Sequence, residues 1–312
     1  MATIDTIADR SNGSEVPGKI YFETSTDKLI AFTGSVWIEL DSDGTGASFQ
    51  NRWGASFDGS SDLMNTRYAP SSSVTALSQS FWMKTDDVTN DMTLGFSDYI
   101  NNGRSFRILS PKGTKAFYVI VVGSSGTYLN NSLGGTNATI SGSTNIRDGL
   151  WHHLVFTIDG TAVKVYIDGG DAAINASNTS NSAGPALTDT STHAYTGGTA
   201  DYTIGRNGTS NYYYYGGLLD DAAIFEYALT DTQVRSMYNN GKPNNISSLS
   251  PKLWYRMGDD VNDSPSNNTN AATITDSSGN GNHATQSTAS AQPTFKALEQ
   301  ATTSLSFDGA AD

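Results

Sequence analysis

The stretch DGLWHHLVFTIDGTAVKVYIDG, residues 148–169, decides the fold of this chain. Apolar residues alternate through HHLVFTID and again through AVKVYID, which is the two-residue period of a strand with one buried face. A Gly-containing turn at Asp159-Gly160 separates the two runs, and Asp168-Gly169 ends the second run. The pattern predicts a β-hairpin with polar turns at both ends.

Runs of the same kind recur along residues 55–238: QSFWMKT (79–85), SFRILS (105–110), AFYVIVVG (116–123) and DYTIGRNG (201–208). Many short strands separated by polar turns are typical of a two-sheet antiparallel sandwich or jelly roll. One short helix is predicted near 230–240. Its signals are a cap at Thr230 or Asp231, an apolar face of Val234, Met237 and Tyr238, and a stop at Gly241. We therefore expect an all-β jelly-roll sandwich with a single short helix.

The composition excludes several classes of function. The 312 residues hold 31 Asp and Glu against 18 Lys and Arg, a formal net charge of −13, which disfavours nucleic-acid binding. The chain has no cysteine, so disulfides, thiolate metal sites and cysteine nucleophiles are excluded. The first residues lack the pattern of a signal peptide, and the longest apolar run, AFYVIVV, is too short to span a bilayer. We expect synthesis in a cytoplasm and no membrane insertion.

Three regions are predicted. GKIYFETSTDKLIAFTGSVWIEL (18–40) is expected to form a small three-stranded meander, which with the linker that follows makes an N-terminal attachment module over 1–50. The jelly roll is expected over 51–245. The last segment, 246–312, contains SSLSPKLWYRM and ITDSSGNGNHATQ and ends on SLSFDGAAD (304–312), which is close to the earlier ASFDGSSD (55–62).

The order SFDGSSD (56–62), SFWMK (80–84), DGLWHHLVFTIDGTAVKVYIDG, YTIGRNG (202–208) and GGLLDDAAIFEYALTDTQVRSMYNNG (216–241) resembles the laminin-G-like domains of the concanavalin-A-like lectin/glucanase superfamily. The resemblance covers most of 54–245 and implies a two-sheet jelly roll. The C-terminal sequence motifs LWYRMGDD, TDSSGNGNHAT and LSFDG resemble the first segment of such a domain. The N-terminal module is similar to a short module at the head of bacteriophage tail-fibre and other virion proteins.

Residues 251–309 cannot make a second domain, because some sixty residues without the main strands leave Trp254, Tyr255, Ile274, Phe295, Leu305 and Phe307 with no opposite sheet. We therefore expect the segment to add strands to a jelly roll. That jelly roll is either its own or that of a neighbouring subunit.

A glycosidase needs two suitably placed carboxylates, and the Glu-x-Asp-x-x-Glu pattern of hydrolases in this superfamily is absent. Asp168 and Asp171 flank Gly169-Gly170, where the pattern favours a hairpin turn. His152 and His153 are neighbours on a predicted strand, so they point to opposite faces and cannot chelate one zinc ion together. His193 and His283 are isolated in polar loops. We expect no catalytic residues.

Calcium is the only cofactor for which the sequence offers candidates, because it prefers the oxygen ligands that Asp- and Asn-rich loops supply. By position in the resemblance, the candidates are Asp220, Asp221, Asp276, Asn280 and Asn282, with Asp58 and Asp62 as weaker ones. The alternative is that these are turn residues whose carboxylates bond to local N–H groups.

Two surfaces are candidates for binding. NYYYYGG (211–217) places Tyr212, Tyr213, Tyr214 and Tyr215 in a row, and strand alternation sends two of these rings to each face. They either pack between strands, contact a neighbouring subunit or stack on sugar rings. In the N-terminal module, Ile20, Tyr21, Phe22 and Trp37 are the candidates for attachment.

The resemblance and the missing catalytic pattern favour a non-enzymatic bacteriophage virion protein: a capsid decoration, head-fibre or tail-fibre subunit on the particle exterior. We expect a homo-oligomer, with a trimer favoured, bound to other capsid or tail proteins and open to host or environmental glycans. The alternative is a lectin-like adhesin that recognises a glycan receptor. A glycoside hydrolase is a minor alternative.

Overall fold

The chain forms two compact units, Met1–Gln50 and Asn51–Asp312. The computed structural model describes residues 5–7, 20–23, 28–32, 37–40, 51–68, 76–97, 105–110, 112–113, 118–122, 128–131, 145–159, 162–172, 202–208 and 213–298. The ending SLSFDGAAD lies outside the described residues. Within the described ranges, no helix has the length and apolar character needed to cross a membrane.

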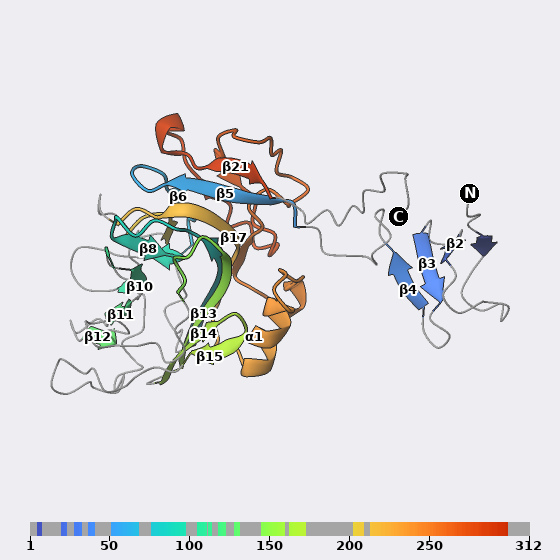
Figure 1. Cartoon of the computed structure of the whole chain (residues 1–312), viewed down its shortest axis with the longest axis horizontal. Coiled ribbons are helices and arrows are strands. Elements are labelled where there is room, and N and C mark those ends of the chain that lie inside the picture. Colours follow the sequence, from blue (N-terminus) through green and yellow to red (C-terminus); the bar gives the residue numbers. More distant parts are fainter. Residues whose placement is uncertain are drawn as a thin grey trace, which may run out of the picture. The chain divides into compact units, whose positions relative to one another are not determined.

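The N-terminal unit is a four-stranded sheet in the order β1-β2-β3-β4 (Figure 1). β2 (Ile20–Glu23), β3 (Lys28–Phe32) and β4 (Trp37–Leu40) are antiparallel neighbours, as the sequence predicted for the meander. β1 (Asp5–Ile7) joins β2 in parallel and was not predicted. Its three residues are too few to show an alternation, so only the pairing with β2 defines it as a strand.

The second unit is built on a large sheet with the strand order β15-β14-β13-β7-β17-β5-β21, and β18 also pairs with β17. The strands are β5 (Trp53–Asp58), β7 (Ala76–Lys84), β13 (Trp151–Asp159), β14 (Ala162–Ile167), β15 (Gly170–Ala172), β17 (Gly216–Phe225), β18 (Leu253–Tyr255) and β21 (Thr294–Ala297).

The predicted hairpin is confirmed as the pair β13 and β14, in register from Leu154 opposite Ile167 to Asp159 opposite Ala162. The turn after β14 has two central residues with positive φ, Asp168 at 53° and Gly169 at 76°. Such a two-residue turn matches the twist of the strands that it joins and explains the Asp-Gly pair. Asp168 is thus a turn residue.

Two smaller sheets face the large one across the core (Figure 1). The first has the order β19-β20-β6-β16-β9, with β6 (Met64–Asn65), β9 (Phe96–Ser97), β16 (Thr203–Ile204), β19 (Thr273–Ile274) and β20 (Ala284–Thr285). The second has the order β12-β11-β10-β8, with β8 (Met92–Leu94), β10 (Ser105–Ser110), β11 (Tyr118–Val122) and β12 (Tyr128–Asn131). The predicted all-β sandwich is confirmed.

The core between the layers combines aromatic packing with the buried amide of Gln79. Phe81 of β7 stacks on Phe156 of β13, and their side chains are fully buried. Gln79 of β7 donates from its Nε2 to the Phe96 carbonyl of β9 at 3.3 Å, and the Phe96 N–H donates back to Gln79 Oε1 at 3.2 Å. The amide therefore extends the backbone pairing of β9 into the core and ties one sheet to the other.

Helix α1 (Asp231–Tyr238) lies where the sequence predicted a helix. Thr230 caps it, because its hydroxyl accepts the N–H of Gln233 while the Gln233 side chain accepts the N–H of Thr230. Val234 and Met237 are buried, and Tyr238 stacks on Trp82 at 5.7 Å between ring centroids. The helix ends at Asn239, whose φ of 44° places it in the left-handed region.

The described part of the C-terminal segment pairs with strands of its own chain. β18 lies beside β17, β21 beside β5, and β20 beside β6, while η2 (Ser247–Leu249) and η3 (Ala289–Ala291) are single 3-10 turns. The side chains of Leu253 and Tyr255 are fully buried within the same core. The segment thus supplies strands to both layers of the sandwich.

We predict that Leu253→Ala lowers the free energy of unfolding of residues 51–298 by about 2–5 kcal/mol, because it leaves a cavity in a shared core. Val261 is 95% exposed in the same segment, so the control Val261→Ala should change stability by less than about 0.5 kcal/mol. Urea unfolding followed by tryptophan fluorescence measures both. Equal midpoints for the two variants would show that the segment is not part of the cooperative unit.

Candidate functional site

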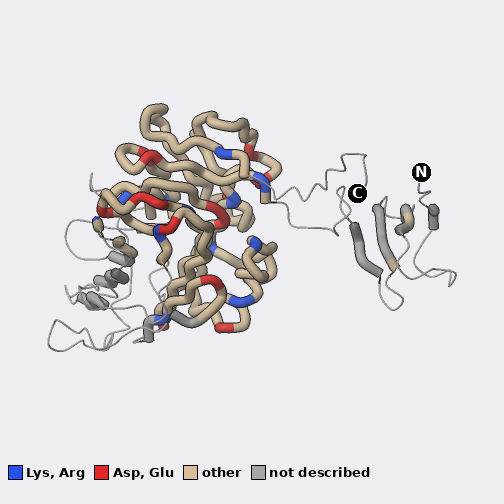
Figure 2. Tube along the Cα trace, in the orientation of Figure 1, with Lys and Arg blue, Asp and Glu red and all other residues tan. Residues whose placement is uncertain are grey.

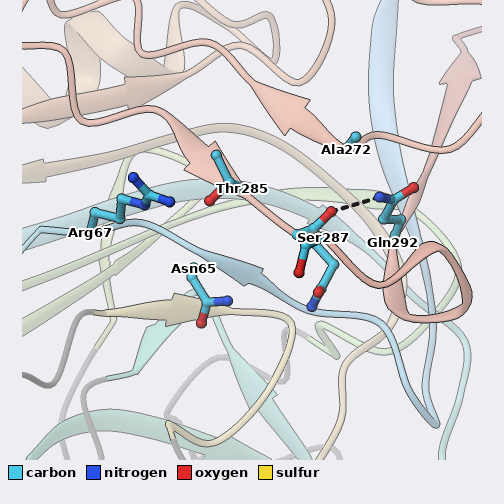
Figure 3. Close-up of a pocket in the computed structure, with 7 residues that line it drawn as sticks. Asn65, Arg67, Ala272, Thr285, Ser287 and Gln292 are labelled. Atoms are coloured by element: carbon cyan, nitrogen blue, oxygen red, sulfur yellow. Dashed lines mark hydrogen bonds between the residues drawn. The ribbon is translucent and has the colours of Figure 1, made fainter.

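A polar pocket of about 520 Å³ opens on the outer side of the five-stranded sheet (Figure 3). In β6, Met64 is buried in the core and Asn65 faces away from it; in β20, Ala284 is buried and Thr285 faces away. Thr285 and Asn65 are direct cross-strand partners, so their side chains lie side by side. The residues that line the pocket are Asn65, Arg67, Ala272, Thr285, Gln286, Ser287 and Gln292.

The far wall of the pocket is a loop, 286–292, that is fixed by several hydrogen bonds. Gln292 Nε2 donates to the Gln286 carbonyl at 2.6 Å, and the Gln286 N–H donates to the Ala272 carbonyl at 2.9 Å. The Leu63 N–H donates to the Ala291 carbonyl at 3.0 Å, which ties the loop to the residue directly before β6. The wall is therefore held in place by backbone bonds before any ligand binds.

Several polar groups in the pocket have no hydrogen-bond partner among the described residues: the amide of Asn65, the guanidinium of Arg67 and the hydroxyls of Thr285 and Ser287. These groups can donate and accept hydrogen bonds in several directions. None of the described residues that line the pocket carries a carboxylate. The arrangement can bind a small polyhydroxylated molecule.

The predicted calcium ligands Asp220 and Asp221 lie elsewhere, in a β-bulge of β17. In the register of the two strands, Asp220 is paired with Trp82 of β7 and Ala223 is paired with Ser80. Three residue steps along β17 therefore span two steps along β7, which defines the bulge. Asp221 has a φ of 41° at this bulge. Their side chains are only 1% and 5% exposed.

The two carboxylates are incompletely hydrogen-bonded. Asp220 Oδ1 accepts the Asp221 N–H at 2.8 Å, and Asp221 Oδ1 accepts the indole N–H of Trp254 at 2.8 Å. The Oδ2 atom of each is buried and has no partner among the described residues. Burial, together with the charges of Asp221 and Asp259, raises the pKa of Asp220 well above its usual value. Burial likewise raises the pKa of Asp221 to about 7, against the opposing charge of Arg256.

The remaining calcium candidates bond to local groups. Asp276 Oδ1 accepts the N–H groups of Trp254 and Ser278, and its Oδ2 accepts the N–H of Asn282. The side-chain amides of Asn280 and Asn282 donate to the Lys252 carbonyl. Asp58 accepts three successive N–H groups, from Ser60, Ser61 and Asp62, as the turn alternative describes.

In the part of the chain that the structure describes, no three His, Asp or Glu side chains are placed to hold one metal ion. Asp220 and Asp221 are adjacent, but Asp276, Asn280 and Asn282 belong to a separate hydrogen-bonded loop. Calcium binding stays a prediction.

The two histidines have different surroundings. His153 stacks on Trp82 at 5.0 Å and bonds to Ser80, and burial lowers its pKa to about 3. His152 lies between Asp168, 2.8 Å from its Nδ1, and Asp148, 3.2 Å from its Nε2. The hydrogen bond to Asp168 raises the pKa of His152 despite burial. Each ring thus has a structural partner of its own.

The tyrosine row is only partly described, because Tyr212 lies outside the described residues. Tyr215 is fully buried and donates its hydroxyl to the Leu218 carbonyl, which fits the packing alternative. Tyr213 is 37% exposed and Tyr214 is half-buried, so these two are the rings that a ligand or subunit could reach. Their role stays a prediction.

The attachment candidates Ile20, Tyr21 and Phe22 lie in β2, and Trp37 begins β4. The ring of Tyr21 is buried. The side chains of the other three are outside the description, so their role in attachment stays a prediction.

The pocket residues were not predicted from the sequence. Asn65 and Arg67 lie about two hundred positions before Thr285 and Gln292. Each sits in a polar stretch without a motif, and only the pairing of β6 with β20 brings them together. The alternation of buried and exposed residues could have placed Asn65 and Thr285 on an outer face, but not opposite each other.

We predict that Asp221→Asn stabilises the protein at pH 8 more than at pH 5. The pKa of Asp221 is about 7 in the folded chain against 3.8 for the free residue. Its contribution to stability is therefore fully present below about pH 4 and is lost as the pH rises through about 7. The variant keeps an acceptor for Trp254 and loses the charge, so the gap in unfolding free energy should widen from pH 5 to pH 8. A gap independent of pH would contradict this.

Calcium binding is tested on the wild-type protein after treatment with a chelator. An ion at Asp220 and Asp221 would favour their ionised forms, so added calcium should raise the melting temperature at pH 8 and release or absorb heat on titration. Asp221→Asn is the matched variant and should lose both effects. No heat and no shift in the wild type would end the calcium hypothesis.

Comparison with known proteins identifies the family of the jelly-roll domain. The model of the concanavalin A-like lectin/glucanases superfamily matches residues 58–235. No curated protein matches the chain.

Solved structures with a similar fold include a "putative carbohydrate binding protein" from Bacteroides ovatus, 15% identical over 91% of this chain and 71% of that one, with a TM-score of 0.51. A heptameric SAP-like pentraxin from Limulus polyphemus is 18% identical over 62% of this chain and 86% of its own, with a TM-score of 0.42. Domain 4 of an extracellular GH43 arabinanase from Geobacillus stearothermophilus, solved with arabinotriose, is 20% identical over 73% and 91%, with a TM-score of 0.36. At these identities the likeness is one of fold. With its jelly roll described and more than half of its length matched, the chain belongs to the concanavalin A-like lectin/glucanases superfamily.

Proposed function

We propose that this chain is a non-enzymatic binding module that holds a saccharide in the pocket between β6, β20 and the loop 286–292. The observation that carries the proposal is the set of pocket groups that have no hydrogen-bond partner among the described residues, the amide of Asn65 and the hydroxyls of Thr285 and Ser287 among them. Such groups match the hydroxyls of a sugar, which both donate and accept. The fold is that of lectins and other carbohydrate-binding domains, which supports this class of ligand.

The size and rigidity of the pocket also support a small ligand. A volume of about 520 Å³ falls within the range of roughly 300–1,000 Å³ that is usual for small-molecule sites. The backbone bonds that hold Gln286 and Ala291 fix the far wall, so little ordering is needed on binding. We expect one or two sugar residues to fill the pocket.

Two observations support a binding role over hydrolysis. Glycosidases need two carboxyl groups on either side of the scissile bond, and the described residues that line the pocket supply none. The adjacent acids of β17, Asp220 and Asp221, have their side chains sealed in the core, where a substrate could not reach them.

A second candidate is a structural subunit of a bacteriophage virion, attached to other capsid or tail proteins as a homo-oligomer. The observation that favours it is the separate N-terminal unit, Met1–Gln50, with a sheet of its own. Such a unit could anchor the chain while the jelly roll faces outward. The two candidates are compatible, and cryo-electron microscopy of intact particles tests the second: a chain absent from the particle would rule it out.

We predict that Thr285→Val lowers saccharide affinity about tenfold, because the variant keeps the shape of the side chain but removes a hydroxyl that would bond to the ligand. Thr273→Val is the matched control: Thr273 is the cross-strand neighbour of Thr285 in β19 but does not line the pocket. A glycan array finds the ligand, and calorimetric titration measures both variants. Equal losses in both variants, or none in Thr285→Val, would place the binding site elsewhere.

A further inference from the structure

We propose that the pocket selects anionic saccharides and that Arg67 binds their carboxylate or sulfate group. The inference rests on the proposed function and names the class of its ligand. The proposed function needs only polar groups in the pocket, whereas this inference attributes the discrimination between anionic and neutral sugars to Arg67.

Arg67 is the single charged residue among the described residues that line the pocket. Acidic residues outnumber basic ones by 31 to 18 in the chain, and Figure 2 shows Lys and Arg interspersed with Asp and Glu over the second unit. Other cations of this unit, such as Lys164 and Lys252, pair with acids. The Arg67 side chain is exposed and pairs with no carboxylate among the described residues. In so acidic a chain, such an unpaired guanidinium is available to an anion from outside.

The backbone at Arg67 is also unusual. Its φ is 54°, in the left-handed region that a long side chain rarely occupies. The residues on either side of Arg67 both bond to Tyr202. The Thr66 N–H donates to the Tyr202 carbonyl at 2.9 Å, and the Tyr202 N–H donates to the Tyr68 carbonyl at 3.0 Å. Three residues, Thr66 to Tyr68, therefore lie opposite the single residue Tyr202, and Arg67 is the middle residue of this β-bulge after β6. Bulges redirect a side chain, and strain of this kind is frequent at binding sites.

The bulge is rigid. The Thr66 hydroxyl donates to the Tyr202 carbonyl at 2.8 Å and accepts the N–H of Tyr68 at 3.2 Å, and the rings of Tyr68 and Tyr202 stack. Because Thr66 and Tyr68 are buried and bonded, the turn that projects Arg67 does not depend on the Arg67 side chain. Replacing that side chain should alter the ligand site and leave the fold intact.

The neighbours of Arg67 suit an acidic sugar. Figure 3 shows Arg67 at one end of the pocket and Gln292 at the other, with Asn65, Thr285 and Ser287 between them. A guanidinium bonds to a carboxylate through two parallel N–H···O bonds, which an uncharged hydroxyl cannot offer. With the anionic group at Arg67, the amide and hydroxyl groups remain for the ring hydroxyls. Uronic acids, sialic acids and sulfated sugars share this chemistry.

The test uses the full chain on a glycan array with four groups of glycans: neutral, uronic-acid-containing, sialylated and sulfated. We expect hits in one or more of the anionic groups, and the group that binds identifies the source of the anion. The best glycan is then titrated against the wild type and Arg67→Gln, with a loss of about tenfold or more expected in the variant. Arg235→Gln, the same exchange at an exposed position of α1, is the matched control and should bind as the wild type does.

The outcomes separate the inference from the proposed function. Hits confined to neutral glycans, or equal affinity in Arg67→Gln and wild type, would overturn the role of Arg67 and leave saccharide binding standing. No hit in any group would overturn the proposed function and this inference with it. Circular dichroism of each variant shows that it is folded, so a loss of binding is assigned to the side chain.

Discussion

Strand β17 is the element on which the rest of the second unit depends. One edge of it pairs with β7, and the other edge pairs first with β5 and then with β18. A single strand therefore holds the start of the jelly roll and its C-terminal segment in one sheet. Without β18 the later half of β17 would expose unpaired backbone groups and a buried apolar face, both of which are unfavourable.

The bulge at Asp220 and Asp221 lies at the point where the partner of β17 changes. Gly216 to Leu219 pair with β5, and Ala222 to Ile224 pair with β18. The indole of Trp254 in β18 bonds to Asp221, so the C-terminal segment also meets the buried carboxylate. Ionising these buried carboxyl groups costs free energy, and this cost therefore arises at the point of β17 where its partner changes from β5 to β18.

Two bulges with a non-glycine residue at positive φ mark the two sites of this unit. Asp221 is turned into the core, where its carboxylate is sealed from solvent and its pKa rises. Arg67 is turned outward at the rim of a polar pocket, where its charge stays exposed. A β-bulge thus places a carboxyl group with a raised pKa in the core at Asp221, and it places an exposed guanidinium beside the pocket at Arg67.

The local part of the architecture follows from the sequence. The alternation in residues 148–169 specifies β13 and β14, Asp168-Gly169 specifies the turn from β14 to β15, and Thr230 with Gln233 specifies where α1 begins. Each of these depends on neighbours within a few residues. The pocket and the acid junction were decided by the tertiary structure alone. Asn65 meets Thr285, and Asp221 meets Trp254, only through strand pairings between distant segments, and the register of such pairings depends on how the whole core packs.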